Sequence, residues 1–296
     1  MYEQISGNIW RSRLLIVSFI IIVSAIGYIF YRAFDNPIAI PLAILFAVIS
    51  TVGSFYYSDQ IILATMQARL VNRDEFAHYV NSVEGLAIAG GLPVPRAYVI
   101  DDPAPNAFAT GRDPQHALIC VTTGLLNMMD RVELEGVIAH EMSHIKNYDI
   151  RFMMLVAVLV GAVAMLADWF WWSGHFGFGR SRDDEEGGGQ GQAIFFAIGL
   201  VLAILAPIAA VLVQAAISRQ REFLADSSGA LLTRFPDGLA SALAKIEADQ
   251  EPLRHANKAT AHLFISNPLR EHGGAMNSLF DTHPPLEERI KRLEAM

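Results

Sequence analysis

Four long apolar runs constrain this chain more than any other feature of its sequence. They cover approximately residues 14–31, 37–58, 152–168 and 192–217, and the first two runs contain no charged residue. A helix needs about 20 predominantly apolar residues to cross the roughly 30 Å of hydrocarbon in a bilayer. We therefore expect four membrane-spanning helices in two hairpins. Two alternatives are a signal peptide for the first run and a buried core helix for the third, shorter run.

Basic residues near the ends of the runs predict the orientation. Eight lie on the side that holds the N-terminus, namely Arg11, Arg13, Arg69, Arg73, Lys146, Arg151, Arg219 and Arg221. Three lie on the other side, namely Arg32, Arg180 and Arg182. Because cytoplasmic loops carry an excess of Lys and Arg, we expect a multi-pass protein of the inner membrane with both termini and the polar domain in the cytoplasm.

Composition narrows the choice of partners. Only 18% of the 296 residues are charged, against about 25% in an ordinary soluble protein. A net charge of -8 offers no basic surface for a phosphate backbone, so we expect no nucleic-acid partner. Cys120 is the single cysteine, which excludes an intrachain disulfide and fits the reducing side of a membrane.

The polar part of the chain predicts a mainly α fold with a small β-sheet. Residues 60–90 have a mainly helical pattern. Short β-branched runs predict strands at 97–100, 106–110 and 117–121. Further helices are predicted at 131–147, 218–232, 237–249 and 285–295. Asp130 and Glu133 have the spacing of a capping box at the start of the first of these helices.

The helix predicted over 131–147 carries His140, Glu141 and His144 in the pattern H-E-x-x-H. Imidazoles four residues apart lie on one helix face, so both can bind one tetrahedral zinc ion. Glu141 can take a proton from the water that the ion activates and deliver it to the leaving amine. The alternative is an amphipathic helix with exposed polar side chains.

A catalytic zinc ion has three protein ligands and one open position. Gly and His would follow at positions 147 and 150 in one known extension of the motif, but Asn147 and Ile150 stand there, so the third ligand must come from elsewhere. Glu222 and Asp226 share a helix face, so one can bind the ion while the other accepts the spare N–H of a ligand imidazole. A solvated carboxylate next to two arginines is the alternative for Glu222.

Topology places both halves of this site on one side of the membrane. The chain leaves the cytoplasm after His144 and returns just before Glu222, across the second predicted hairpin. We therefore expect the metal centre close to the bilayer surface.

Other motifs accompany the zinc motif in a definite order. Pro-Asn-Ala-Phe-Ala-Thr-Gly at 105–111 precedes it, and Glu-x-x-x-Asp at 222–226 and Thr-His-Pro at 282–284 follow it. In these motifs, and in the order of two spans, core, two spans and C-terminal helices, the chain resembles the HtpX membrane zinc metalloproteases, relatives of the CAAX prenyl endoproteases. The resemblance covers most of the chain. It implies a gluzincin-like domain made of 59–151 and 219–296, preceded by a membrane hairpin at 1–58 and interrupted by a second hairpin at 152–218.

The resemblance also implies the roles of individual residues. One zinc ion would be held by His140, His144 and Glu222, with Glu141 as general base and acid. Asp226 would contact one of these ligand residues without binding the ion itself. The edge strand that receives the substrate backbone would be formed by Asn106, Ala107, Phe108, Ala109 and Thr110, which agrees with the ability of an extended peptide to add to an open sheet edge. His283 and Arg289 would face the tetrahedral intermediate, where a donor stabilises the oxyanion.

Alternatives remain for these last residues. The segment 106–110 alone is also consistent with an ordinary strand. His283 before two prolines is consistent with a turn residue, and Arg289 with a partner of Asp226 or another carboxylate.

The expected function is that of a zinc endopeptidase acting on polypeptides, chiefly damaged or misfolded membrane proteins, beside the bilayer. The resemblance alone implies this quality-control role. One alternative is a CAAX-type prenyl-peptide protease, and another is a non-catalytic membrane zinc scaffold in which a fourth ligand such as His283 closes the site.

Overall fold

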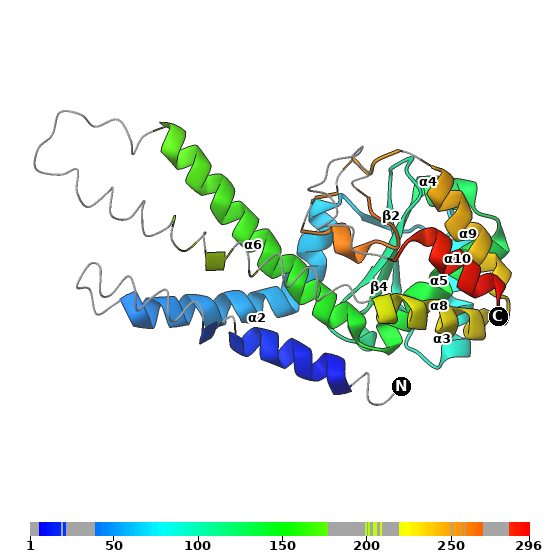
Figure 1. The fold of residues 1–296 in the computed structure, drawn as a ribbon, viewed down its shortest axis with the longest axis horizontal. Helices are drawn as coiled ribbons and strands as arrows, with labels where there is room; N and C mark the ends of the chain where they lie inside the picture. The colour runs from blue at the N-terminus through cyan, green and yellow to red at the C-terminus, as the bar shows by residue number, and fades with distance from the viewer. Residues whose placement is uncertain are drawn as a thin grey trace, which may run out of the picture.

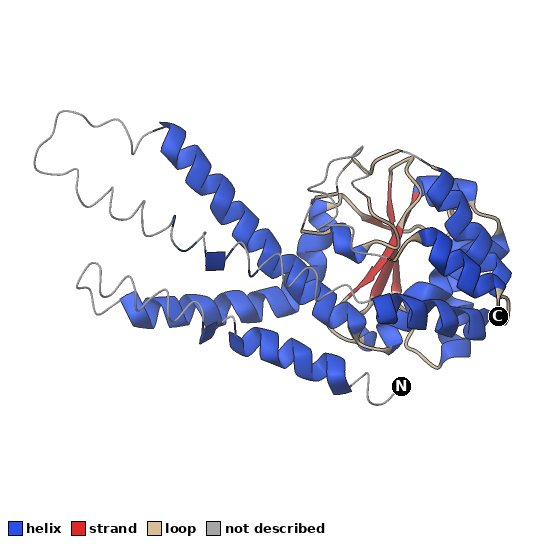
Figure 2. Ribbon diagram, viewed as in Figure 1, coloured by secondary structure: helices blue, strands red, loops and turns tan. Residues whose placement is uncertain are grey.

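The structure, a computed structural model, is mainly helical with one small sheet (Figures 1 and 2). It describes residues 6–18, 20–21, 39–176, 219–249, 251–254, 256–257, 259–268 and 284–296, together with positions 199, 201, 204, 205 and 208. The fold class expected from the sequence, mainly α with a small sheet, is confirmed.

The sheet contains four strands in the order β1 (Arg69–Leu70), β2 (Arg96–Ile100), β4 (Leu118–Thr122) and β3 (Ala107–Thr110). β2 and β4 are parallel, and the two outer strands run antiparallel to their neighbours. The sequence predicts three of these strands to within one residue. It misses β1 and predicts helix there, because two residues are too few to show an alternating pattern.

Five helices form the body on one side of the sheet (Figure 1). They are α3 (Ala77–Gly90), α5 (Arg131–Lys146), α8 (Arg219–Thr233), α9 (Pro236–Ala248) and α10 (Leu286–Glu294). Shorter pieces are α4 (Thr123–Met128), η1 (Pro114–His116) and η2 (Ala261–Leu263). The predicted capping box is present, since the Asp130 carboxylate accepts the Glu133 backbone N–H and the Glu133 carboxylate accepts that of Asp130, each at 2.9 Å.

The sheet separates two hydrophobic cores. Ile119 and Val121 of β4 face the core that the body helices fill, whereas Leu118 and Cys120 face a second core. This alternation follows from the two-residue period of a strand. The second core contains residues from the end of α2 (Ala39–Thr65) and the beginning of α6 (Asp149–Phe176).

Helices α2 and α6 pack against each other and extend away from the body as an arm (Figure 1). Most of the predicted run 37–58 lies in α2, and the run 152–168 lies in α6, which continues to Phe176. Much of the runs 14–31 and 192–217 falls outside the described residues. Among the residues that the structure describes, no helix combines the length and apolar character needed to cross a membrane. The four spans stay a prediction.

Candidate metal centre

The two histidines of the zinc motif lie one turn apart on α5 and point to the same side. His140 and His144 are 1% and 4% exposed. Their rings stand nearly perpendicular, at 85°, and their Nε2 atoms are 3.2 Å apart. The helix face predicted from the spacing therefore carries both imidazoles into one buried space.

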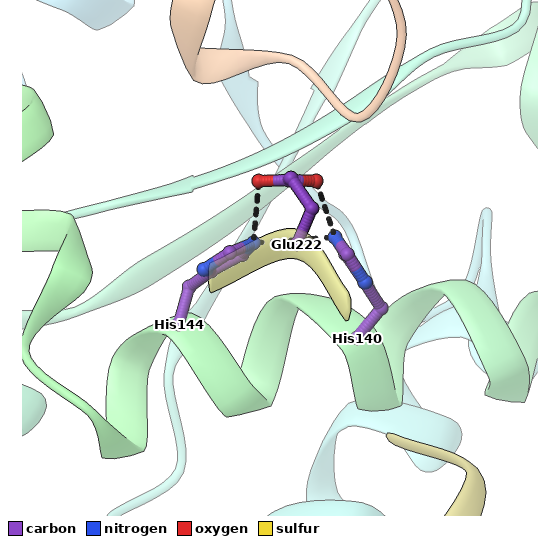
Figure 3. Close-up of side chains that lie close together, drawn as sticks. All are labelled: His140, His144 and Glu222. Carbon is purple, nitrogen blue, oxygen red and sulfur yellow. Dashed lines mark hydrogen bonds and ion pairs between the residues drawn. The ribbon is translucent and has the colours of Figure 1, made fainter. Parts of the chain in front are cut away.

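Glu222 of α8 completes this group from the far side (Figure 3). Its Oε2 lies 3.7 Å from Nε2 of His140, and its Oε1 lies 3.6 Å from Nε2 of His144. The ligand atoms of the three residues all lie within 4.8 Å of one another. The fold thus brings positions 144 and 222 together, although the second predicted hairpin, whose first run lies in α6, separates them in sequence.

The donor set fits a zinc ion. Ligands about 2.0 to 2.2 Å from a tetrahedral ion lie about 3.3 to 3.6 Å from one another. The two Nε2 atoms here are 3.2 Å apart, and each of them lies 3.6 or 3.7 Å from a different oxygen of Glu222. Two imidazole nitrogens and one carboxylate oxygen are also ligands that zinc takes in catalytic sites. His140, His144 and Glu222 could therefore hold a metal ion.

Each imidazole is oriented by a carboxylate on its other nitrogen. Nδ1 of His140 lies 2.9 Å from Asp226 Oδ1, and Nδ1 of His144 lies 3.1 Å from Asp149 Oδ2. When Nδ1–H donates to the carboxylate, Nε2 of the neutral ring presents its lone pair to the space shared with Glu222. Two lone pairs this close repel unless a proton or a metal cation lies between them.

The sequence identifies Asp226 as one such partner but misses Asp149. This residue is the first of α6, five positions after His144, and the turn between the two helices includes Tyr148 at a positive φ of 60°. That turn returns the chain towards the end of α5. An aspartate at the start of the helix that follows the motif was the available signal.

Arg289 of α10 is fully buried beside the same group. Its Nε and Nη2 donate to the two Asp226 oxygens at 2.9 and 2.7 Å, and its Nη1 donates to the Ile265 carbonyl at 3.0 Å. Nη1 also lies 3.5 Å from Glu222 Oε2. These contacts match the alternative of a pairing with Asp226, and the role towards a reaction intermediate stays a prediction.

Burial and neighbouring charges together shift the pKa values of Glu141 and His144. Burial raises the pKa of Glu141 to about 7, and the negative charge of Glu222 adds to this rise. Burial alone lowers the pKa of His144, but Asp149 and Glu222 outweigh it and raise that pKa to about 9. The carboxylates of Asp149 and Glu222 therefore favour a positive charge next to His144, and a bound metal cation would supply such a charge.

The predicted substrate strand lies at the end of the sheet, in β3. Its other neighbour is a short segment of the same chain, because the Ile265 backbone N–H donates to the Ala107 carbonyl at 2.9 Å and Phe264 forms an isolated bridge with Phe108. The Ala109 backbone N–H contacts the Glu141 carboxylate. All five residues from Asn106 to Thr110 are buried. His283 lies outside the described residues.

Comparisons with known proteins agree with this geometry. The model of peptidase family M48 matches residues 74–296. The protease HtpX homolog of Thermoanaerobacter pseudethanolicus is 46% identical over 297 residues, covering 100% of this chain and 98% of the relative. The protease HtpX homolog of Thermococcus sibiricus is 45% identical, covering 92% of this chain and 90% of the relative.

One solved structure shares the fold. The crystal structure of Ste24p from S. mikatae superposes with a TM-score of 0.52 at 20% identity, covering 99% of this chain and 67% of that one. The chain belongs to peptidase family M48 and is a metalloprotease of the HtpX type.

Proposed function

We propose that this chain is a membrane-bound zinc endopeptidase with one zinc ion held by His140, His144 and Glu222. The observation that carries the proposal is the convergence of these three side chains, from two helices, on a single buried space, with their ligand atoms within 4.8 Å of one another. Glu141 lies on the same helix between the two histidines and is 2% exposed. The H-E-x-x-H helix and the distant Glu222 together provide the three ligands and the general base that a hydrolytic zinc site requires.

Zinc bound there supplies Lewis acidity to the scissile carbonyl and acidifies the attacking water. Glu141 takes the proton from that water on its carboxylate and delivers it to the leaving amine. Asp226 and Asp149 hold the two imidazoles in the tautomer that leaves Nε2 available. Arg289 keeps the Asp226 carboxylate in place. Arg289 and His283 are also proposed to face the tetrahedral intermediate and to stabilise its oxyanion.

The substrate class is an extended polypeptide that pairs with the outer edge of β3. Main-chain pairing recognises a backbone without requiring one side-chain sequence. The position of β3 at the end of the sheet, with its Ala109 N–H against Glu141, supports this assignment. Residues 106–110 would hold the scissile bond next to the general base.

The membrane arrangement is proposed from the sequence runs and the relatives. Hairpins at 1–58 and 152–218 would anchor a domain made of 59–151 and 219–296 at the cytoplasmic face of the inner membrane. Misfolded or damaged membrane proteins are then the substrates that such a site meets, and quality control is the corresponding role.

A matched pair of glutamine variants tests the catalytic assignment. The full chain is purified in detergent, loaded with zinc and given a fluorescently labelled unfolded polypeptide. Glu141→Gln is expected to lower the cleavage rate by about 10² to 10⁴-fold while one zinc ion per chain stays bound. Glu135→Gln, the same change on the outer part of α5, is expected to leave the rate unchanged. Full activity of Glu141→Gln would end the assignment.

Labelling tests the orientation. In a Cys120→Ala background, cysteines are introduced singly as Ser181→Cys and Met296→Cys. A membrane-impermeant maleimide is expected to label position 181 only from outside intact cells and position 296 only in inverted membrane vesicles. The reverse pattern, or labelling of both from one side, contradicts the proposed topology.

A further inference from the structure

Asn8 belongs to the N-terminal helical residues 6–18, yet its side chain is buried against the turn between α5 and α6. It is 4% exposed. Its Nδ2 donates to Asp149 Oδ1 at 2.6 Å and to the Asn147 carbonyl at 2.9 Å. Nothing in the proposed chemistry uses this contact, although it spans 141 positions of the chain.

Asp149 connects Asn8 to the metal centre. The carboxylate is 1% exposed, and its Oδ2 holds Nδ1 of His144 at 3.1 Å while its Oδ1 accepts the Asn8 amide. The Arg221 guanidinium stands farther away, with Nη1 3.9 Å from Oδ1. The contact from the N-terminal segment, at 2.6 Å, is shorter than both of these.

This contact acts on the direction in which His144 points. A buried carboxylate that loses a short hydrogen bond on one oxygen turns to find another donor, and its second oxygen moves with it. The imidazole that donates to this second oxygen then turns as well, and Nε2 shifts relative to Glu222. Partners behind metal ligands act in this way, and their loss typically costs about 10- to 100-fold in metal affinity.

We propose that Asn8 is a positioning residue of the metal centre, acting through Asp149 on His144. The N-terminal segment is then part of what tunes metal affinity and is not only an anchor. This inference rests on the proposed function, because it requires His144 to be a metal ligand.

The test measures zinc affinity directly, by competition with a chromophoric chelator, on the full chain in detergent. Asn8→Leu keeps the side-chain size and removes the donor, and it is expected to weaken zinc binding by about 3- to 10-fold. Asn8→Asp places two carboxylates against each other and is expected to weaken it by about 10- to 100-fold. Ser12→Ala is the control. Ser12 is buried one turn away in the same segment, and its Oγ donates to the Asn8 carbonyl, not to Asp149. The zinc affinity of this variant is expected to stay within about twofold of the wild type.

A swapped pair separates positioning from folding. In the double variant Asn8→Asp with Asp149→Asn, the amide at 149 donates to the new carboxylate and its carbonyl accepts the His144 N–H. This variant is expected to bind zinc at least about fivefold more tightly than Asn8→Asp alone, which is within the effect that hydrogen-bond partners of metal ligands have on metal affinity. The cobalt-loaded forms give a second readout, since a turned imidazole shifts the visible absorption bands.

The outcomes are distinct. If Asn8→Leu and Asn8→Asp bind zinc as the wild type does, or if they lower only the melting temperature of the metal-free protein, the inference is wrong. If Asn8→Asp does not fold, Asn8→Leu alone decides. If the wild type binds no zinc, or binds it equally well after His144→Ala, the proposed function itself has failed.

Discussion

Gly229 of α8 lies so close to His140 of α5 that a Cβ atom at position 229 would come within 3.0 Å of the His140 backbone nitrogen. The absence of a side chain at this point lets the two helices that carry the donors approach each other. The reach of Glu222, seven residues earlier on α8, depends on this approach.

Gly229→Ala is therefore expected to push α8 away from α5. We expect a destabilisation of about 1 to 3 kcal/mol, as for other overpacked contacts, together with weaker zinc binding. Thermal unfolding and chelator competition measure the two effects. Gly85→Ala on α3 is the control, because a Cβ there meets nothing within 4 Å; it is expected to stabilise by about 0.5 to 1 kcal/mol. Equal behaviour of the two variants would contradict the role given to Gly229.

Arg289→Met is expected to be strongly destabilising, because it leaves the buried Asp226 carboxylate without its guanidinium partner. Breaking a buried ion pair from one side costs about 3 to 5 kcal/mol. Adding Asp226→Asn to the variant is expected to recover part of this loss, since the charge of Asp226, which has the shortest contacts to Arg289, is then removed as well. Unfolding of the metal-free protein measures each value, with the exposed Lys291→Met on the same helix as control. A double variant less stable than Arg289→Met would count against this account.

Glu133 predicts a pH dependence away from the metal centre. Burial raises the pKa of its carboxyl, but hydrogen bonds from Lys245, Ser241 and the Asp130 backbone outweigh burial, so the pKa lies below its usual value. A group with a lowered folded pKa stabilises above its unfolded pKa, about 4.3, and loses this effect as the pH falls through the folded pKa.

Glu133→Gln is accordingly expected to lower stability by about 1 to 2 kcal/mol at pH 7. The difference from the wild type should shrink as the pH falls below about 4. Melting temperatures at several pH values measure it, and Glu135→Gln serves as the surface control. A difference that grows towards acid pH would show that the sign is wrong.

Metal removal is expected to lower stability, because ligands from α5 and α8 are held together only in the folded state. A ligand present at about 1,000 times its Kd stabilises by about 4 kcal/mol. A chelator should therefore lower the melting temperature of the wild type, and added zinc should restore it. The His140→Ala, His144→Ala double variant should respond to neither, and a response there would place the metal elsewhere.

The predictable parts of the fold are those with a local pattern. The helix over 131–146 follows from a capping box and from apolar residues at helical spacing, such as Leu134, Val137 and Ile138. Three strands follow from β-branched runs between turns. The two-residue strand β1 has no pattern long enough to detect. Its position depends on pairing with β2, which is a tertiary contact.

The same distinction applies to the site. The spacing of His140 and His144 places them on one face of α5, whereas the approach of Glu222 depends on how α8 packs. Asp149 and Asn8 were missed because their roles arise from a turn and from a contact across most of the chain. Such contacts leave no periodic signal in the sequence.

The backbone of Ile265 makes two contacts: its N–H donates to the Ala107 carbonyl, and its carbonyl accepts from the Arg289 guanidinium. A polypeptide that pairs along the whole outer edge of β3 must first displace this backbone. The guanidinium that steadies Asp226, and through it His140, would then lose one of its acceptors. Docking of a long substrate on β3 and the alignment of the proposed ligand His140 would then be mechanically linked, through the backbone of a single residue far from α5 in sequence.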